Sequence, residues 1–515
     1  MLIPIHHSCK SFLTLIALLL ITNASYAEIG NSEAWVTSSS KRMDNQPEQV
    51  LESSTRASVE VALDLSQTGQ SIDGFGWMLN QGSAKLLMQL DANDRVAILR
   101  ELYGKEGLHS SMVRVAIGAC DLSESDYTYA DSKDETLSNF AIAQQDLTTV
   151  IPILQEILTI NPKIKVLACA WTAPTWMKSG AAWYNSYVDG TLKTDYYNLY
   201  ADYFIKYLEA MAAWGIPVWG ISVQNEPLNG NNDPSMKWTK EAMYTFIAGS
   251  LGPKLRSSEY SSTRIIAYDH NCDVTDFPIH VAKSKYVYGT AFHLYAGDIS
   301  ALSTVYNSSG KPVLFTEQYT GKDGDFNGDL SWHIQNVVLG SLKNHSTTAL
   351  EWNLCSDPSY SIHTSGGCTT CKGALTISNR QVSARNVSYY IIGHVSRVID
   401  TDARMIAATP SDNNINCVAA LNADGTIGVV AYCSGDQSRR VAFSFHHPVT
   451  GEKLYATHTF PGKSVISVRI RPDANTAVEQ VSTSGNTRKL IRNGQLLIEH
   501  NGTYYNPLGQ AVMNK

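Results

Sequence analysis

The sequence has few charged residues and no long block of one sign. Of its 515 residues, 17% are charged, and the formal net charge is −7. The absence of a basic stripe argues against nucleic acid as a partner. Because 43% of the residues are apolar, the chain can fill a large core, which argues against a disordered protein.

Long apolar runs are also scarce. The run "SFLTLIALLLIT" at residues 11–22 is shorter than the roughly 20 residues that span a bilayer. It follows a weakly basic start and precedes the small residues of "ASYA", which is typical of a secretory signal peptide at residues 1–27. We expect cleavage after Ala27, a secreted or periplasmic protein and no stable membrane insertion. A retained membrane anchor is the alternative.

Motifs for cofactors and metals are missing or incomplete. "DGFGWM" is not the GxGxxG turn of dinucleotide-binding folds. "CTTC" at 368–371 has no second CxxC or HxxxH, so it is weak evidence for zinc. His293, His270 and Asp269 lack the HxxxH-type spacing of a metallohydrolase, and we interpret Asp269–His270 as a loop pair. We therefore expect no cofactor and no metal.

Cysteine, in contrast, is present in numbers that permit disulfides. One of the nine cysteines lies in the predicted signal peptide, and eight remain. Cys355, Cys368 and Cys371 are close enough in sequence for a local bridge. Cys417 and Cys433 flank "NADGT", a hairpin signal that is expected to make them face each other across two strands.

Short apolar strands alternate with helical patterns over residues 67–395. "NDRVAILRELYG" and "YNLYADYFIKYLEAMAAWG" have apolar residues at helical spacing and end on glycine. Such alternation predicts an α/β fold, a (β/α)8 TIM barrel, with a doubly wound open sheet as the alternative. The strand candidates are 72–79, 111–118, 164–171, 218–225, 264–270, 286–295, 311–318 and 348–354.

The regions on either side of the barrel have other patterns. Residues 396–472 alternate between apolar and polar and contain turn signals, which predicts a side-associated all-β sandwich. We interpret residues 28–66 as a loose leader followed by one strand, "SVEVALDL", that joins this sandwich. In the tail, 473–515, Asn501-Gly502 between two strand-like runs predicts a β-hairpin.

Two glutamates follow barrel strand candidates. Glu226 ends "VWGISVQNE" and Glu317 ends "VLFTE". Since active sites of TIM barrels lie at the C-terminal ends of the strands, we expect the two carboxylates to share one face. Trp171, Tyr295 and Trp352 stand at other strand ends, where they would form a bowl suited to sugars.

A pair of carboxylates flanking an acetal bond can cleave it. The general acid must keep its proton, and the nucleophile must stay ionised, so it needs donors nearby. Arg114 and Tyr295 are the candidates for these donors, and His293 is expected to bond a sugar hydroxyl.

Several motifs occur in collinear order over roughly residues 70–510. They are "DGFGWMLNQGSAKLL", "VRVAIGACDLSESDYTYAD", "ACAWTAPTWMKSGA", "VQNEP", "HLYAGD", "LFTEQYTG", "EWNLCSDP" and "YYIIGHVSRVI". Together they resemble glycoside hydrolase family 30, the family of acid β-glucosidase (glucosylceramidase). The resemblance implies a (β/α)8 barrel with a side sandwich, and a retaining mechanism with Glu226 as acid/base and Glu317 as nucleophile. It also implies substrate-binding roles for Arg114, Asp121, Trp171, Asn225, Tyr295 and Trp352.

The stretch "SYSIHTSGGCTTCKGALTI" departs from the vertebrate pattern. It is more similar to bacterial and fungal members, some of which cleave β-1,6-glucan. We predict a secreted retaining β-glycoside hydrolase that cleaves β-D-glucosidic bonds and is glucosylceramidase-like, with a glycolipid or a β-glucan oligosaccharide as substrate. The alternatives are an endo-β-1,6-glucanase or β-xylosidase of the same family and, more remotely, a non-catalytic carbohydrate-binding protein.

Overall fold

The computed structural model describes residues 29–181, 186–473, 487–492, 495–500, 503–505 and 511–512. The predicted signal peptide and the turn residues Asn501 and Gly502 lie outside these ranges. Among the helices that are described, none is long and apolar enough to cross a membrane.

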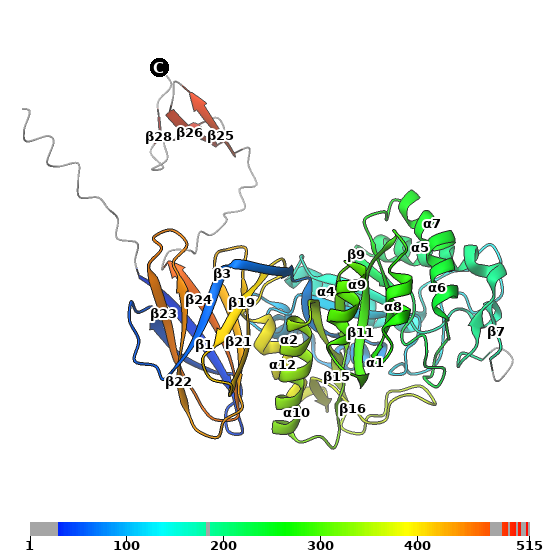
Figure 1. Ribbon diagram of the computed structural model, residues 1–515. Coiled ribbons are helices and arrows are strands. Elements are labelled where there is room, and N and C mark those ends of the chain that lie inside the picture. Colours follow the sequence, from blue (N-terminus) through cyan, green and yellow to red (C-terminus); the bar gives the residue numbers. More distant parts are fainter. Residues whose placement is uncertain are drawn as a thin grey trace, which may run out of the picture. The chain divides into compact units, whose positions relative to one another are not determined.

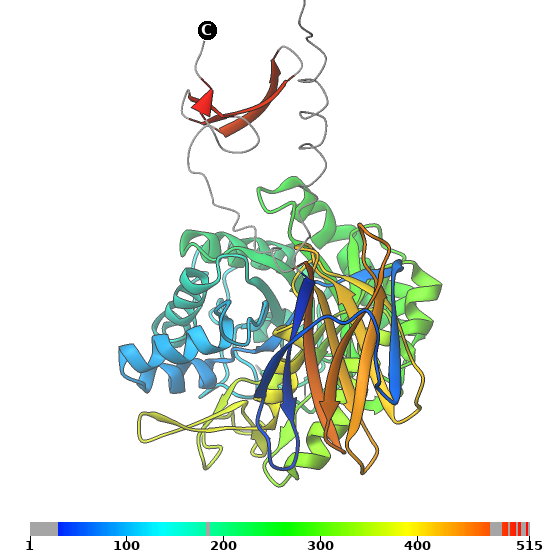
Figure 2. The same ribbon diagram turned by 90° about the vertical axis from the view of Figure 1, so that its left-hand side faces the viewer.

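Eight parallel strands close into a barrel, which confirms the predicted fold class (Figures 1 and 2). All eight strand candidates from the sequence are present, with shifted ends. The strands follow one another around the barrel in sequence order. They are β4 (Gly74–Met78), β5 (Met112–Ile117), β6 (Lys165–Ala170), β9 (Val218–Ser222), β10 (Arg264–Cys272), β11 (Val287–Gly297), β12 (Val313–Glu317) and β14 (Ser346–Asn353).

Helices surround the barrel, as Figure 2 shows most clearly. The two helical patterns named above form α2 (Ala92–Tyr103) and α5 (Tyr197–Ala213). The other helices are α1 (Gln81–Gln89), α3 (Gln144–Thr148), α4 (Val150–Ile160), α6 (Lys240–Phe246), α7 (Gly252–Ser257), α8 (Asp276–Val281), α9 (Ala301–Ser309), α10 (Phe326–His333), α11 (Leu339–Lys343) and α12 (Val387–Ser396).

The barrel interior changes from apolar to polar along the strands. An apolar layer is formed by Met112, Leu167, Ile266, Ala291, Leu314 and Leu350. Side chains two residues further along a strand face the same side. In this way Arg114 follows Met112, and His293 follows Ala291, each one layer closer to the C-terminal ends. The packed layer therefore forms the floor on which the polar site is built.

A nine-stranded sheet with its own apolar core lies beside the barrel (Figure 1). Its strands run in the order β2-β1-β24-β21-β20-β19-β3-β22-β23. A bridge between Glu52 and Tyr455 joins the two ends of this sheet, so the sheet folds over into the expected sandwich. The bounds are β1 (Ile29–Thr37), β2 (Asp44–Val50), β3 (Val59–Ser71), β19 (Arg404–Pro410), β20 (Ile415–Leu421), β21 (Ile427–Cys433), β22 (Arg439–His446), β23 (Lys453–Phe460) and β24 (Ser464–Asp473).

The interpretation of the residues before "SVEVALDL" as a loose leader is wrong, because β1 and β2 are strands of the sandwich. Both faces of β1 are covered. Ala34 and Val36 belong to the sandwich core, whereas Trp35 packs into the barrel core with Arg397 over its ring. The polar residues around this short apolar stretch concealed the strand in the sequence.

The hairpin around "NADGT" is present, but its two cysteines do not pair. In the register of β20 and β21, Cys417 is opposite Ala431 and Cys433 is opposite Ile415. Both cysteines are buried free thiols, so the expectation that they face each other is wrong. The local bridge predicted in the trio is present, between Cys368 and Cys371.

The tail forms a separate antiparallel sheet of four strands. In agreement with the predicted hairpin, β26 (Gln495–His500) pairs with β27 (Thr503–Tyr505). The two remaining strands are β25 (Thr487–Arg492) and β28 (Ala511–Val512).

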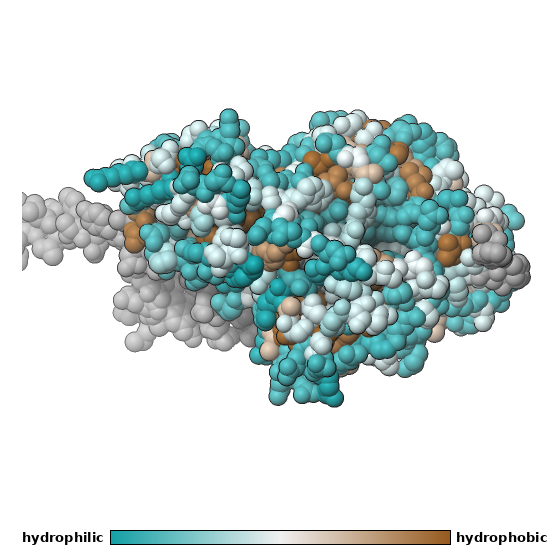
Figure 3. Space-filling view, turned by 90° about the horizontal axis from the view of Figure 1, so that it is seen from below, coloured by the Kyte–Doolittle hydropathy of each residue, from teal (hydrophilic) through white to brown (hydrophobic). Residues whose placement is uncertain are grey.

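The face of the molecule in Figure 3 is largely hydrophilic, with small, scattered hydrophobic areas. Single exposed apolar side chains are normal on a globular protein.

Candidate active site

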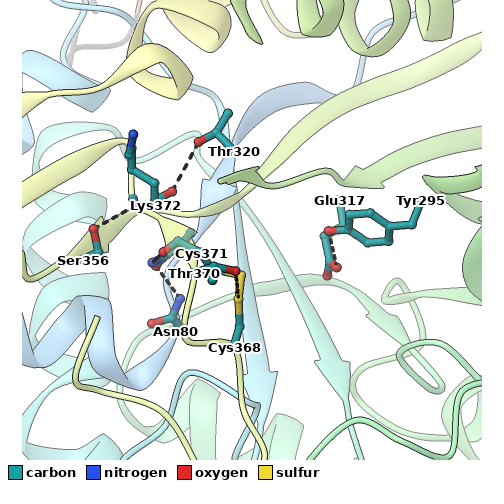
Figure 4. Close-up of a disulfide and its surroundings, with 11 residues drawn as sticks. Asn80, Tyr295, Glu317, Thr320, Ser356, Cys368, Thr370, Cys371 and Lys372 are labelled. Atoms are coloured by element: carbon teal, nitrogen blue, oxygen red, sulfur yellow. Dashed lines mark hydrogen bonds between the residues drawn. A yellow bond between two sulfur atoms is a disulfide. The ribbon is translucent and has the colours of Figure 1, made fainter. Parts of the chain in front are cut away.

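Glu317 is the last residue of β12, and it is held by donors on two sides. Arg114 Nη1 donates to Glu317 Oε2. The Tyr295 hydroxyl donates to Glu317 Oε1 at 3.0 Å (Figure 4). His293 Nδ1 lies 3.6 Å from Oε1. The two donors expected from the sequence, Arg114 and Tyr295, thus contact this carboxylate.

Glu226 lies just beyond β9 in a conformation that few side chains adopt. Its φ is 45°, in the left-handed region, and Pro227 follows. Such backbone strain is concentrated at functional sites. The Glu226 N–H donates to Asp269 O at 2.9 Å, and this bond helps to fix the bend. Asn229 and Asn232, in the loop that follows, donate their amides to Glu226 Oε2 at 2.8 and 2.9 Å.

His293 connects the two glutamates with a third carboxylate beneath them. Its Nδ1 is 3.0 Å from Glu226 Oε1, and its Nε2 is 3.1 Å from Asp269 Oδ1. Because both ring nitrogens face carboxylates, the protonated imidazolium, which can donate from both, satisfies both contacts.

Asp269 is the hub of this network, and the sequence did not reveal it. It is fully buried and accepts hydrogen bonds from Arg114 Nη2 at 3.1 Å, and from the hydroxyls of Ser222 and Thr316 at 2.6 Å each. The interpretation of Asp269–His270 as a loop pair is wrong, since both lie within β10.

An irregularity in β10 places Asp269 inside the barrel. Ile266 belongs to the interior layer, so strict alternation would direct Tyr268 inward next. However, the pairing with β11 shifts between Tyr268 and His270, and both Tyr268 and Asp269 have positive φ. Tyr268 therefore packs in the outer core, and Asp269 takes the inward place.

The charges set the protonation of the cluster. Burial opposes a charge on His293, but the carboxylates of Glu317, Asp269 and Glu226 outweigh it and raise the pKa of His293 to about 10. Burial alone would raise the pKa of Glu226, but the bond from His293 and its charge lower the pKa to about 2. Burial, together with the charge of Glu226, raises the pKa of Glu317.

Above these carboxylates is a pocket of about 370 Å³. Its lining residues are Asp121, Trp171, Asn225, Glu226, Asn229, Asn232, Asn271, Tyr295, Glu317, Tyr319, Trp352, Cys368, Thr370 and Cys371. Seven of the nine site residues predicted from the sequence are in this lining. The other two, Arg114 and His293, are fully buried and bond to the carboxylates from below.

The walls of the pocket differ in exposure. Trp171 and Trp352 are nearly buried, with ring centroids 5.7 Å apart. Tyr295 and Tyr319, 5.8 Å apart, are 38% and 37% exposed and form an open aromatic shelf on the Glu317 side.

Burial and the charge of Glu317 raise the pKa of Asp121 to about 8.

Glu226, His293 and Glu317 have the geometry that a metal ion would need, with ligand atoms within 4.8 Å of one another. A metal-binding histidine must offer a neutral nitrogen, however, and the surrounding carboxylates keep His293 protonated. The cluster is better suited to handling protons than to holding a cation.

Comparison with known proteins identifies the family. The model of the glycosyl hydrolase family 30 TIM-barrel domain matches residues 72–399, more than half of the chain. The chain belongs to glycosyl hydrolase family 30.

Relatives in family 30 act on different substrates. An endo-1,6-beta-D-glucanase of Aspergillus fumigatus is 31% identical over 72% of this chain and 80% of its own length. The lysosomal acid glucosylceramidase of Mus musculus is 25% identical over 76% of this chain and 80% of its own length. The solved structure of the endo-beta1,6-glucanase BT3312 superposes with a TM-score of 0.79 at 33% identity, over 85% of this chain and 99% of that one. The chain is thus a glycosyl hydrolase, with glucanases and glucosylceramidases among its relatives.

Proposed function

We propose that this family 30 enzyme is a retaining β-glycoside hydrolase that cleaves β-1,6-glucan. The distance between the two carboxylates is the observation that supports a retaining mechanism. One oxygen of Glu226 and one of Glu317 lie within 4.8 Å of each other. Retaining glycosidases place their carboxyl groups about 5–5.5 Å apart, whereas inverting ones leave about 6.5–9.5 Å for a water. The spacing supports direct attack by one glutamate and a covalent glycosyl-enzyme.

Glu317 is the proposed nucleophile. Arg114 and Tyr295 hold its two oxygens in place, and His293 contributes a nearby positive charge. Such fixed donors oppose the effect of burial on the pKa of Glu317 and aim the carboxylate at the anomeric carbon. The attack forms a bond from Glu317 to the sugar and breaks the bond to the departing oxygen.

Glu226 is the proposed general acid and base, and His293 is its source of protons. The shared proton belongs to His293, because its pKa is about 10 and that of Glu226 is about 2. The proton passes from Nδ1 to Glu226 Oε1 across their 3.0 Å contact, and from there to the departing oxygen. In the second step Glu226 takes a proton from a water molecule, and this water attacks and hydrolyses the sugar ester of Glu317. The proton then returns from Glu226 to His293 and restores the imidazolium.

The proposed substrate follows from the relatives and from one loop. Endo-1,6-glucanases are among the relatives at 30% identity or more, whereas a putative glucosylceramidase of Caenorhabditis elegans is at 29% and the mouse glucosylceramidase is at 25%. The loop with "SGGCTTC" differs from the vertebrate pattern and is more similar to bacterial and fungal members, some of which cleave β-1,6-glucan. Glucosylceramide is the second candidate, since other relatives are glucosylceramidases and would use the same two carboxylates.

A hydrolysis panel tests this proposal. The purified enzyme is incubated with β-1,6-glucan, with glucosylceramide in detergent micelles, and with aryl β-glucoside and aryl β-xyloside. We expect oligosaccharides from the glucan, with the β-anomer as the first product seen by NMR. Turnover of glucosylceramide without turnover of glucan would overturn the proposed substrate, and a first product in the α-form would overturn retention.

We also propose that the enzyme is exported by its N-terminal segment and cleaved after Ala27. The disulfide between Cys368 and Cys371 supports this, because such bonds persist in oxidising compartments.

A further inference from the structure

The disulfide lies in a segment that the proposed mechanism does not use. We call residues 357–370 the rim segment. It connects β15 (Cys355–Ser356) to β16 (Cys371–Lys372), and the bridge from Cys368 to Cys371 closes its end. Figure 4 shows this bridge in one view with Glu317 and Tyr295.

Hydrogen bonds tie the middle of the rim segment to two other loops of the site. The Thr364 N–H donates to Asp121 O at 3.0 Å, and its hydroxyl donates to Asp233 O at 2.6 Å. The Gly366 N–H donates to Asp233 Oδ2 at 2.7 Å. The segment therefore spans from the loop after β5 to the loop that follows Glu226.

The end of the rim segment is tied to the strand of the predicted nucleophile. β16 pairs with β13 (Thr320–Gly321), which begins three residues after Glu317. The Lys322 N–H donates to Thr370 O at 2.9 Å, and Asn353 Nδ2 donates to Cys371 O at 3.0 Å. The backbone of the segment is thus fixed on both sides of the bridge.

The bridge itself forms part of the pocket wall. Cys368, Thr370 and Cys371 line the pocket together with Asp121 and Trp352. Both cysteines also pack in the apolar cluster that contains Trp171 and Trp352. The family resemblance implies substrate-binding roles for Asp121, Trp171 and Trp352, so we assign the bridge to the wall around the sugar whose bond is broken.

A bridge between residues three apart closes a very small loop, so it constrains the unfolded chain little. Its effect is local: it fixes the tip formed by Thr369, which is exposed, and Thr370, which is half-buried. We propose that the Cys368–Cys371 bridge is a specificity-determining element that holds the wall against the glycone sugar. This inference rests on the proposed glycosidase function and adds a residue pair to it.

The test compares the double variant Cys368→Ser/Cys371→Ser with Cys417→Ser, which removes a buried free thiol in the sandwich. We expect the double variant to raise KM about tenfold, the scale of one lost apolar contact. Its kcat should stay within about twofold, because the groups that react are untouched. The rise should be equal for an aryl β-glucoside and for a β-1,6-glucan oligosaccharide, which share the glycone.

Two further measurements test whether the rise in KM comes from the altered pocket wall rather than from misfolding of the variant or from the substrate used. Treating the folded enzyme with a phosphine, and counting the new thiols by mass spectrometry, should raise KM as the double variant does. The Kd of the glucose-shaped inhibitor 1-deoxynojirimycin, measured by calorimetry without turnover, should rise by the same factor.

An unchanged KM and Kd in the reduced enzyme and in the double variant would overturn the inference. An effect on the glucan oligosaccharide alone would overturn the assignment to the glycone side. If the wild-type enzyme hydrolyses neither substrate, the proposed function fails, and the Kd of the inhibitor still decides whether the bridge is part of the wall.

Discussion

Two fully buried histidines in two regions of this enzyme have opposite charge states. His293 lies at the strand ends of the barrel, within 3.6 Å of three carboxylates, and its pKa is raised to about 10. His394 lies in α12, between the barrel and the sandwich, where burial lowers its pKa to about 3. Both side chains have no exposed surface.

The neighbours of His394 are hydroxyls that satisfy only its neutral form. Ser467 Oγ donates to the His394 carbonyl at 2.7 Å, so it must accept from Nδ1 at 2.6 Å. Thr37 Oγ1, which accepts from the Met43 N–H, then donates to Nε2 at 2.7 Å. A second ring proton would leave the Thr37 hydroxyl hydrogen without this acceptor.

The comparison shows that burial alone does not decide whether a group is charged. The partners do, since hydroxyls satisfy a neutral ring and carboxylates stabilise a protonated one. The neutral ring of His394 joins α12 to two strands of the sandwich through its hydrogen bonds. The charged ring of His293 holds a proton beside the carboxylates of the site.

The largest expected effect comes from removing Glu317, one of the three carboxylates that surround His293. Glu317→Gln should lower kcat by at least about 10⁴-fold, because the nucleophile is lost. Glu351→Gln is the matched control: Glu351 is also buried and contacts a histidine, His333, at 2.7 Å, but it does not line the pocket. Near-normal turnover by Glu317→Gln, or an equal loss in both variants, would contradict the assigned role.

A smaller effect is expected from removing the proton source. His293→Gln should lower kcat about 10²-fold, the scale of proton transfer, and should move the alkaline limb of the pH–rate profile to lower pH. The wild-type limb follows the loss of the proton from His293, whose pKa is about 10. In the variant Glu226 must hold the proton itself, with a carboxyl pKa. An alkaline limb that stays in place would show that His293 does not supply the proton.

The smallest effect concerns stability at the other histidine. The pKa of His394 is about 3 in the folded state and about 6.5 when unfolded, so only the unfolded chain binds the proton between these values. Stability is therefore lost as pH falls below about 6.5, by about 2 kcal/mol at pH 5.

Denaturation of His394→Gln and of the wild type at pH 7 and pH 5 tests this. The variant should be less stable at pH 7 and should lose less on acidification, by about 2 kcal/mol. Equal losses in the two proteins would contradict a lowered pKa of His394 in the folded state.

The sequence was sufficient for the strands and for the residues at their ends. Glu226 and Glu317 could be found because Glu317 ends the apolar strand β12 and Glu226 follows the apolar strand β9, and the family resemblance implied their roles. Asp269 could not, because a register shift in β10 reverses the alternation from which inward positions are counted. Asn229 and Asn232 could not be found either, because they lie in a loop. Its conformation brings them to Glu226, and the spacing of apolar residues does not predict the conformation of a loop.

The most direct test of the central claim is to trap the glycosyl-enzyme. A 2-deoxy-2-fluoro-β-glucosyl fluoride forms the sugar ester but slows its hydrolysis, so the labelled protein accumulates. Peptide mapping by mass spectrometry should find one fluorosugar per chain, on Glu317. A label on another residue, or turnover of substrate with no trapped ester, would contradict the account.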